Sequence, residues 1–293
     1  MRIMQAELVL DARAVLGEGP VWDFRRQRLW WVDIEGQELH VFDPLAGEDR
    51  AIPVGQPVSA VVMRAARSGG LMLAVKEGFA IFDVGTERLT LIARPEAELP
   101  GNRFNDGKCD PAGRFWAGTM GPEPRQGALY CLDTDLSVKR KIERVSISNG
   151  LAWSPDGGTM YYIDSTAHVI AAYEYDTATG EIANRRVVVE MPVEAGEPDG
   201  MTIDVEGMLW VALWDGGSVV RYRPADGAVL ARVSVPVSRP TSCAFGGADL
   251  DTLFITSART GLDERALSAE PHAGGLFCCR PGVRGMPAAD FGG

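Results

Sequence analysis

Four oxygen-bearing side chains open short apolar segments of this 293-residue chain at matching places. They are Glu18, Asn105, Asn149 and Asp199, and a second apolar run begins 10 or 11 residues after each of them. Carboxylate and amide oxygens are the donors that hard divalent cations such as Ca²⁺ or Mg²⁺ prefer, and Mn²⁺, Zn²⁺ or Fe²⁺ can also use them. The spacing therefore indicates a shared site for one divalent cation. The alternative is that the Asn and Asp side chains cap turns at strand ends.

The glutamate at position 18 favours the metal site over turn capping. Glutamate is a poor capping residue, and Glu18 stands between two glycines without another evident role. Glycine also follows Asn149 and Asp199 directly. Because glycine has no side chain, it allows backbone segments to approach closely, as they must where several strands converge on one axis.

The four segments belong to a repeat that runs through the chain. Short apolar runs recur at intervals of 42 to 49 residues, at 29–33, 71–75, 115–119, 160–164, 209–213 and 253–257. Each unit contains further short strands and turn residues, whereas a helical pattern is confined to residues 263–269. Six units with four strands each predict an all-β six-bladed β-propeller that forms a single domain over residues 1–293.

The last repeat is short of a fourth strand, because only a Pro/Gly-rich segment follows Cys279. The apolar segment 6–10 precedes the first complete repeat. We expect this N-terminal strand to pair with the last blade, which would close the ring and remove an exposed sheet edge.

A propeller would bring the four oxygen-bearing side chains together. Their shared place in the repeat is the start of the innermost strand, at one mouth of the central channel. Most tryptophans lie within blade strands and are expected to pack in the core. Trp214 follows a strand in a loop, so it could line the same mouth.

Composition argues against several classes of function. The formal net charge of −11 does not suit nucleic acid, whose phosphates require a basic surface. No apolar run approaches the ~18 residues of a membrane helix, and the N-terminal segment lacks a signal-peptide core. We therefore expect a cytoplasmic protein, either a monomer or a weak homo-oligomer.

The cysteines and histidines do not form a recognisable catalytic motif. The five cysteines are odd in number and lack CxxC spacing, so we interpret them as reduced packing residues. His40, His168 and His272 are isolated from one another and from the oxygen-bearing positions. The HExxH and GxSxG motifs are also missing from the sequence.

Several long motifs resemble one family of enzymes. They are LGEGPVW at 16–22, NRFNDGKCDPAGRFWAGTM at 102–120, ISNGLAWSPDG at 147–157, EPDGMTIDVEG at 197–207 and PTSCAFGGADLDTLFITSAR at 240–259. Together they resemble the senescence-marker-protein/gluconolactonase/regucalcin family of sugar lactonases. The resemblance extends over nearly the whole chain. It implies a six-bladed propeller that binds one divalent metal in its channel and hydrolyses aldonolactones.

The resemblance also implies a role for individual residues. The family's metal ligands match Glu18, Asn149 and Asp199, and Asp199 would also be the general base. Its substrate-binding residues match Arg103 and Asn105 within the motif at 102–120 and Glu123 just after it. The segment 121–125, which contains Glu123, is shorter than in the animal members.

Four functions remain to be compared. The first is metal-dependent hydrolysis of a small-molecule sugar lactone, and the second is calcium binding without catalysis, as associated with animal relatives. The third is hydrolysis of aryl esters or organophosphates, which other metal-containing propellers support. The fourth is a protein-interaction propeller, which would not need a channel lined by oxygen atoms and Arg103.

Overall fold

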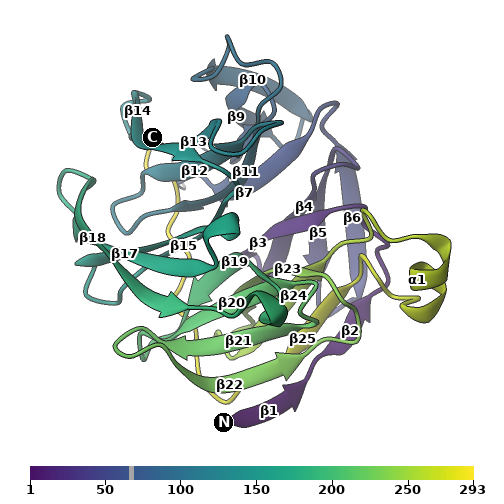
Figure 1. The fold of residues 1–293 in the computed structure, drawn as a ribbon. Coiled ribbons are helices and arrows are strands. Elements are labelled where there is room, and N and C mark those ends of the chain that lie inside the picture. Colours follow the sequence, from purple (N-terminus) through teal and green to yellow (C-terminus); the bar gives the residue numbers. More distant parts are fainter. Residues whose placement is uncertain (66–68) are drawn as a thin grey trace.

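The computed structural model describes residues 1–65 and 69–293, and it has six sheets arranged as blades around a central channel (Figure 1). Strands account for 56% of the chain and helices for 4%, which confirms the predicted six-bladed, all-β fold. The innermost strands of blades one to six are β3 (Gly17–Asp23), β7 (Val58–Met63), β11 (Arg103–Cys109), β15 (Ser148–Trp153), β19 (Glu197–Ile203) and β23 (Pro240–Gly246).

The outer strands follow in chain order within each blade. The second strands coincide with the six predicted apolar runs and are β4 (Arg28–Asp33), β8 (Leu71–Val75), β12 (Phe115–Met120), β16 (Thr159–Asp164), β20 (Leu209–Trp214) and β24 (Thr252–Ser257). The third strands are β5 (Glu38–Asp43), β9 (Gly78–Asp83), β13 (Gly127–Leu132), β17 (Val169–Asp176), β21 (Ser218–Arg223) and β25 (Leu276–Cys279). Blades one to five continue with β6 (Glu48–Pro53), β10 (Arg88–Ala93), β14 (Val138–Val145), β18 (Glu181–Glu190) and β22 (Ala228–Ser234).

The core consists of hydrophobic clusters between neighbouring blades. Each pair of adjacent blades shares one cluster, including the pair formed by the first and the last blade. On β4, Trp30 packs toward blade two and Trp31 toward blade six. Because both faces of a blade are covered, its second strand is apolar at consecutive positions and does not alternate with polar residues.

Buried aspartates hold the turns that join the first strand of a blade to the second. Asp110 accepts the indole N–H of Trp116 at 3.0 Å, and Asp204 accepts that of Trp210 at 2.9 Å. Both carboxylates also accept backbone N–H groups of their own turn. These bonds satisfy charged groups that are fully buried, and they fix the second strand against the first.

The ring closes through the N-terminal segment as predicted. Strand β2 (Glu7–Leu10) pairs antiparallel with β25 and supplies the fourth strand of blade six. Strand β1 (Arg2–Gln5) was not predicted; it pairs parallel with β22 and adds a fifth strand to blade five. The rings of Trp22 and Phe254 stack across the same closure, with their centroids 5.7 Å apart.

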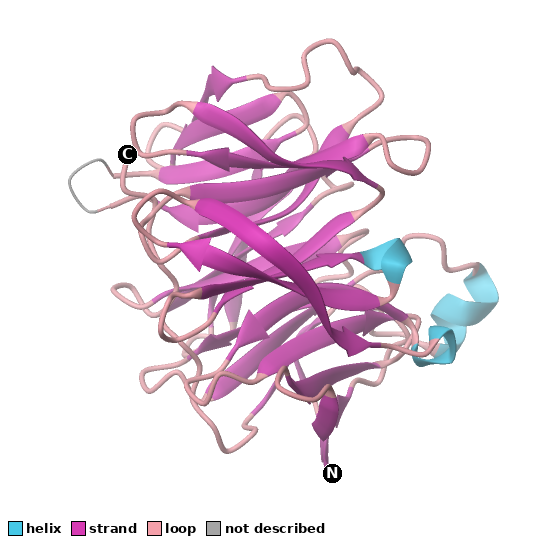
Figure 2. Cartoon of the chain, turned by 60° about the vertical axis from the view of Figure 1, so that its left-hand side comes forward, coloured by secondary structure: helices cyan, strands magenta, loops and turns pink. Residues whose placement is uncertain are grey.

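The two faces of the ring differ in what covers them. The 3₁₀ turns η1 (Ser165–Ala167) and η2 (Val193–Ala195) and the short helix α1 (Glu264–Ala269) lie on one face (Figure 2). The C-terminal segment 280–293 crosses the other face, where Phe291 donates its backbone N–H to the carbonyl of Met63 at 2.8 Å. Among the residues described, none belongs to a helix that is long and apolar enough to cross a membrane.

Deletion of residues 1–13 should lower the melting temperature by about 10 °C or more. The truncation exposes the edge of β25 and removes apolar side chains that pack against the cluster between blades six and one, a loss of several kcal/mol in the free energy of unfolding. Differential scanning calorimetry measures the change. Deletion of residues 1–5 alone is the matched control, because it removes β1 and retains β2. Equal melting temperatures for the full chain and the longer deletion would contradict the closure.

Candidate functional site

The four oxygen-bearing residues lie on four innermost strands and line one pocket. Glu18 is on β3, Asn105 on β11, Asn149 on β15 and Asp199 on β19. The pocket has a volume of about 300 Å³ and opens at the face that carries η1 and η2. All four side chains are at most 7% exposed, so they face a narrow channel mouth and not bulk solvent.

An irregularity in strand pairing accompanies each of these positions. The register of β3 against β4 shifts between Glu18 and Val21, and β11, β15 and β19 shift at the corresponding places. A bulge bends its strand and redirects side chains, which is why bulges are common at binding sites. The bulges here turn the starts of the innermost strands toward the channel.

The glycines beside the site residues are required by the close approach of neighbouring strands. A Cβ atom on Gly150 would lie 2.9 Å from the carbonyl oxygen of Asp199 and 2.6 Å from the side chain of Ile163. A Cβ atom on Gly200 would lie 2.1 Å from the Ser242 hydroxyl oxygen. The glycine pattern noted in the sequence therefore serves the packing of the innermost strands around the axis.

Two carboxylates at the ends of second strands hold the backbone just before two of the site residues. Asp33 accepts the backbone N–H of Leu16 at 2.9 Å, two residues before the first candidate ligand. Asp164 accepts the backbone N–H of Ile147 at 3.0 Å, again two residues before a candidate ligand. These side chains fix the backbone just upstream of the site in blades one and four.

A chain of hydrogen bonds fixes the orientation of the two amide side chains. Arg103 Nη1 donates to Asn105 Oδ1 at 2.7 Å, and Asn105 Nδ2 donates to Asn149 Oδ1 at 2.9 Å. Asn149 Nδ2 donates to Ser165 Oγ at 2.8 Å, and this hydroxyl donates to the carbonyl of Pro198 at 2.6 Å. The Asn149 amide oxygen accepts one of these bonds and keeps a second lone pair for a ligand.

Burial and neighbouring negative charges destabilise the ionised forms of both carboxylates of the site. Burial, and next the negative charge of Asp106, raise the pKa of Glu18 to about 8, although the Gly19 N–H and Arg103 oppose this rise. Burial raises the pKa of Asp199 well above its ordinary value, and the charges of Glu18 and Asp106 add to the effect. A cation between these groups would relieve the repulsion and hold both carboxylates ionised.

The donor set fits a hard divalent cation better than a soft one. No group of three or more His, Cys, Asp or Glu side chains in residues 1–65 and 69–293 is placed to hold a metal. The candidate set instead combines two carboxylates with the amide oxygen of Asn149, and amide oxygens are common ligands of Ca²⁺. Glu18, Asn149 and Asp199 are therefore the residues that could hold the ion.

Comparisons with known proteins agree with the fold. Residues 16–259 match the family described as the SMP-30/Gluconolactonase/LRE-like region.

The chain belongs to the SMP-30/gluconolactonase/LRE-like family.

Regucalcin of Gallus gallus is 43% identical over 301 residues that cover both chains completely. The putative sugar lactone lactonase YvrE of Bacillus subtilis (strain 168) is 42% identical over 292 residues, 99% of each chain. The crystal structure of a calcium-binding protein, regucalcin, from Agrobacterium tumefaciens superposes with a TM-score of 0.94 at 32% identity and 99% coverage of each chain.

The residues that the family resemblance singled out do not all meet in this member of the SMP-30/gluconolactonase/LRE-like family. Arg103 and Asn105 line the pocket together with the three candidate metal ligands. Trp214 also lines it, although it is the last residue of β20 and does not lie in a loop as expected. Glu123 is exposed in the turn after β12 and is not among the lining residues. Its contact with a substrate stays a prediction.

Other pocket residues were missed from the sequence. Glu197 is two residues before Asp199 on β19, a spacing that places both on one side of a strand and could have identified it. Glu35 and Thr260 come from different blades, and the Thr260 hydroxyl donates to Glu35 Oε2 at 2.9 Å. Ser165 lies in η1 and offers no sequence signal, because its role depends on contacts with two other strands.

In the metal-free protein, the free energy of unfolding should fall as pH rises from about 5 to 8. The folded-state pKa of Glu18 is about 8 against an ordinary value of 4.5, so the folded state binds more protons than the unfolded state in this window. Raising the pH therefore favours unfolding, and Glu18→Gln should flatten the dependence. Denaturant titrations with a chelator present would measure it.

The control for this measurement is Glu194→Gln, which changes an exposed glutamate outside the pocket. This variant should keep the pH dependence of the unaltered chain. Equal slopes for Glu18→Gln and the unaltered chain would show that Glu18 does not carry a raised pKa.

Proposed function

We propose that this chain is a sugar lactonase that hydrolyses an aldonolactone to the aldonic acid, with one divalent cation held by Glu18, Asn149 and Asp199. The observation that carries the proposal is the buried pair of carboxylates beside an oriented amide oxygen, in a pocket of about 300 Å³. That volume suits a small ligand such as a sugar ring. The similarity to a Bacillus subtilis protein named as a putative sugar lactone lactonase supports the same function.

The cation would have a defined place in this chemistry. A bound divalent cation polarises an ester carbonyl and lowers the pKa of water in its vicinity. Three protein ligands leave further coordination positions for substrate and water, which a catalytic site requires. The all-oxygen ligand set admits Ca²⁺, Mg²⁺, Mn²⁺, Zn²⁺ or Fe²⁺.

Asp199 is the residue that we assign to proton transfer. The proposed cation would keep the buried Asp199 carboxylate ionised, so that it can accept a proton. It would take a proton from the attacking water as the water oxygen bonds to the lactone carbonyl carbon. It would then return the proton to the ring oxygen as the carbon–oxygen bond of the ring breaks, so the product is the open-chain acid.

Arg103 and Asn105 would hold the sugar ring in place. The Arg103 guanidinium donates to Asn105 and lies in the field of Glu35, Glu18 and Asp199, which keeps it in the pocket. Its remaining N–H groups can donate to hydroxyl or carbonyl oxygens of a lactone. A substrate contact by Glu123 would need the turn at 121–125 to approach the pocket.

Calcium binding without catalysis is the second candidate function. The Agrobacterium tumefaciens relative is described as a calcium-binding protein, and the oxygen ligands of this pocket suit that ion. Binding alone would not require Arg103 beside the ligand set, so turnover decides between the two functions.

A panel of lactones tests the proposal directly. Glucono-, galactono-, xylono- and arabinonolactone would be incubated with the protein, with and without a chelator, and acid release would be followed. We expect turnover of at least one lactone, its loss with the chelator and its return when a divalent cation is added. Tight Ca²⁺ binding without turnover would instead support a binding protein. Hydrolysis of aryl esters or organophosphates alone would support the third class of function.

Asp199→Asn should lower the rate of lactone hydrolysis by at least about 10²-fold, because it removes the proposed general base and one anionic ligand. The fold should be retained, since asparagine has nearly the same volume. The matched control is Asp135→Asn in an exposed turn of blade three, which should leave the rate unchanged. A near-normal rate for the Asp199 variant would remove this residue from the reaction.

A further inference from the structure

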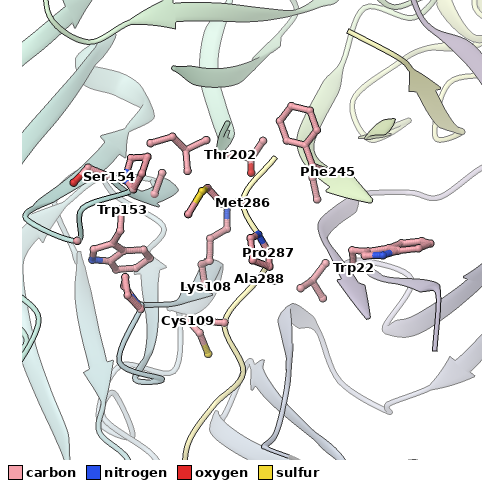
Figure 3. A pocket seen from close by; sticks show the side chains of 18 of the residues that line it. Trp22, Lys108, Cys109, Trp153, Ser154, Thr202, Phe245, Met286, Pro287 and Ala288 are labelled. Atoms are coloured by element: carbon pink, nitrogen blue, oxygen red, sulfur yellow. The ribbon is translucent and has the colours of Figure 1, made fainter. Parts of the chain in front are cut away.

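The channel has a second mouth, on the face that the C-terminal segment crosses. The far ends of all six innermost strands, together with residues 286–289, line a pocket of about 320 Å³ there (Figure 3). Its wall is mainly apolar, and Trp22, Trp153 and Phe245 are its large aromatic side chains. It shares no lining residue with the pocket of the proposed lactonase site. A concave apolar pocket with few polar groups is typical of a site for a small organic ligand.

The C-terminal segment spans this mouth between two backbone anchors. Gly285 donates its N–H to the carbonyl of Leu250 at 2.8 Å, and Phe291 donates to the carbonyl of Met63 at 2.8 Å. Residues 287–289, which lie between the anchors and line the pocket, are one proline and two alanines. Their backbone makes no hydrogen bond to the other residues that the structure describes. A ligand beneath this stretch therefore meets small side chains and displaces no backbone partner.

Lys108 carries the one cationic group among the described residues that line this pocket. Its side chain extends from β11 between the two tryptophans toward Met286 (Figure 3), and its Nζ donates to the carbonyl oxygen of Met201 on β19 at 2.5 Å. No described carboxylate forms an ion pair with this ammonium, whereas Lys141 pairs with Glu181 at 2.9 Å. An ammonium has three N–H groups, so two of them are left for a ligand.

The nearby acidic side chains are engaged elsewhere. Asp106, two residues before Lys108 on β11, accepts the backbone N–H of Gly107 at 2.7 Å and lines neither pocket. Asp156 lines the second mouth, but it is exposed to solvent and accepts the hydroxyl of Ser154 at 2.5 Å. A neutral carbonyl compensates poorly for taking an ammonium group out of water, so the Lys108 ammonium would gain from an anion in the pocket.

We propose that the second mouth is a binding site for a small carboxylic acid with an apolar body, whose carboxylate is held by the Lys108 ammonium. The apolar body packs against Trp22, Trp153 and Phe245, and it loses contact with water there. The two N–H groups left on Lys108 match the two oxygens of one carboxylate, and the charges balance. A phosphate ester would bring a second negative charge, for which the described lining offers no second cation.

Isothermal titration calorimetry with a matched pair of probes tests this site. The probes are 3-phenylpropanoate and 3-phenylpropanol, which have the same apolar body with and without the carboxylate. The unaltered chain should bind the acid at least about tenfold more tightly than the alcohol, because charged hydrogen bonds add to the same apolar contacts. Lys108→Met should bind the two probes equally. Lys139→Met, which changes an exposed lysine on the outer strand β14, is the matched control and should keep the preference for the acid.

A second variant keeps the test decisive if Lys108→Met does not fold, as judged by circular dichroism and thermal unfolding. Ala244 is half-buried on β23 and lines the pocket, so Ala244→Phe fills the cavity and should abolish binding of both probes.

Equal affinities of the unaltered chain for acid and alcohol would overturn the proposal. So would an acid affinity that survives Lys108→Met or Ala244→Phe, or displacement of the acid by a sugar lactone, which would assign it to the first pocket. Lactone turnover does not enter these outcomes, so the proposed lactonase function stands or fails separately.

Discussion

The packing of each blade against both of its neighbours is the constraint on which the rest of this structure depends. A four-stranded sheet with two apolar faces cannot bury both by itself, and each large side chain left exposed would forfeit about 1.5–3 kcal/mol. Trp30 and Trp31 meet this requirement by packing toward opposite neighbours. The sixth blade can be covered only if it meets the first, which the stacked rings of Trp22 and Phe254 accomplish. Closure then directs all six innermost strands toward one axis.

Convergence of the strands has an electrostatic consequence. Residues at equivalent places in different blades meet at the channel mouth, so Glu18 and Asp199 share a confined space with Asn105 and Asn149. Their pKa values are raised because burial disfavours the charged carboxylates, and next because other negative charges lie nearby. The Gly19 N–H and the Arg103 guanidinium lower this cost at Glu18 without removing it. A bound cation would relieve this repulsion, which is the property that the proposed lactonase would use.

Much of the architecture could be predicted because its signals are local. Spaced apolar runs identified the second strands, because the residues of each run are themselves buried. The strand at 6–10 was predicted from the missing edge of the last blade. The parallel addition of β1 to blade five could not be predicted, because it depends on a contact between residues more than 200 positions apart. Glu35 likewise meets Thr260, 225 positions away, whereas Ser165 contacts Asn149 in its own blade and Pro198 in the next.

The amino-acid sequence by itself determined the repeat, the number of blades and the shared place of Glu18, Asn105, Asn149 and Asp199, because period and residue type are properties of the chain. Only the tertiary structure decided which of these side chains face one pocket, how Asn149 is oriented and where Glu123 lies. It also decided that the Lys108 ammonium reaches the Met201 carbonyl of blade five. The physical reason is that burial, charge coupling and hydrogen-bond direction arise between blades, and the spacing within one blade does not encode them.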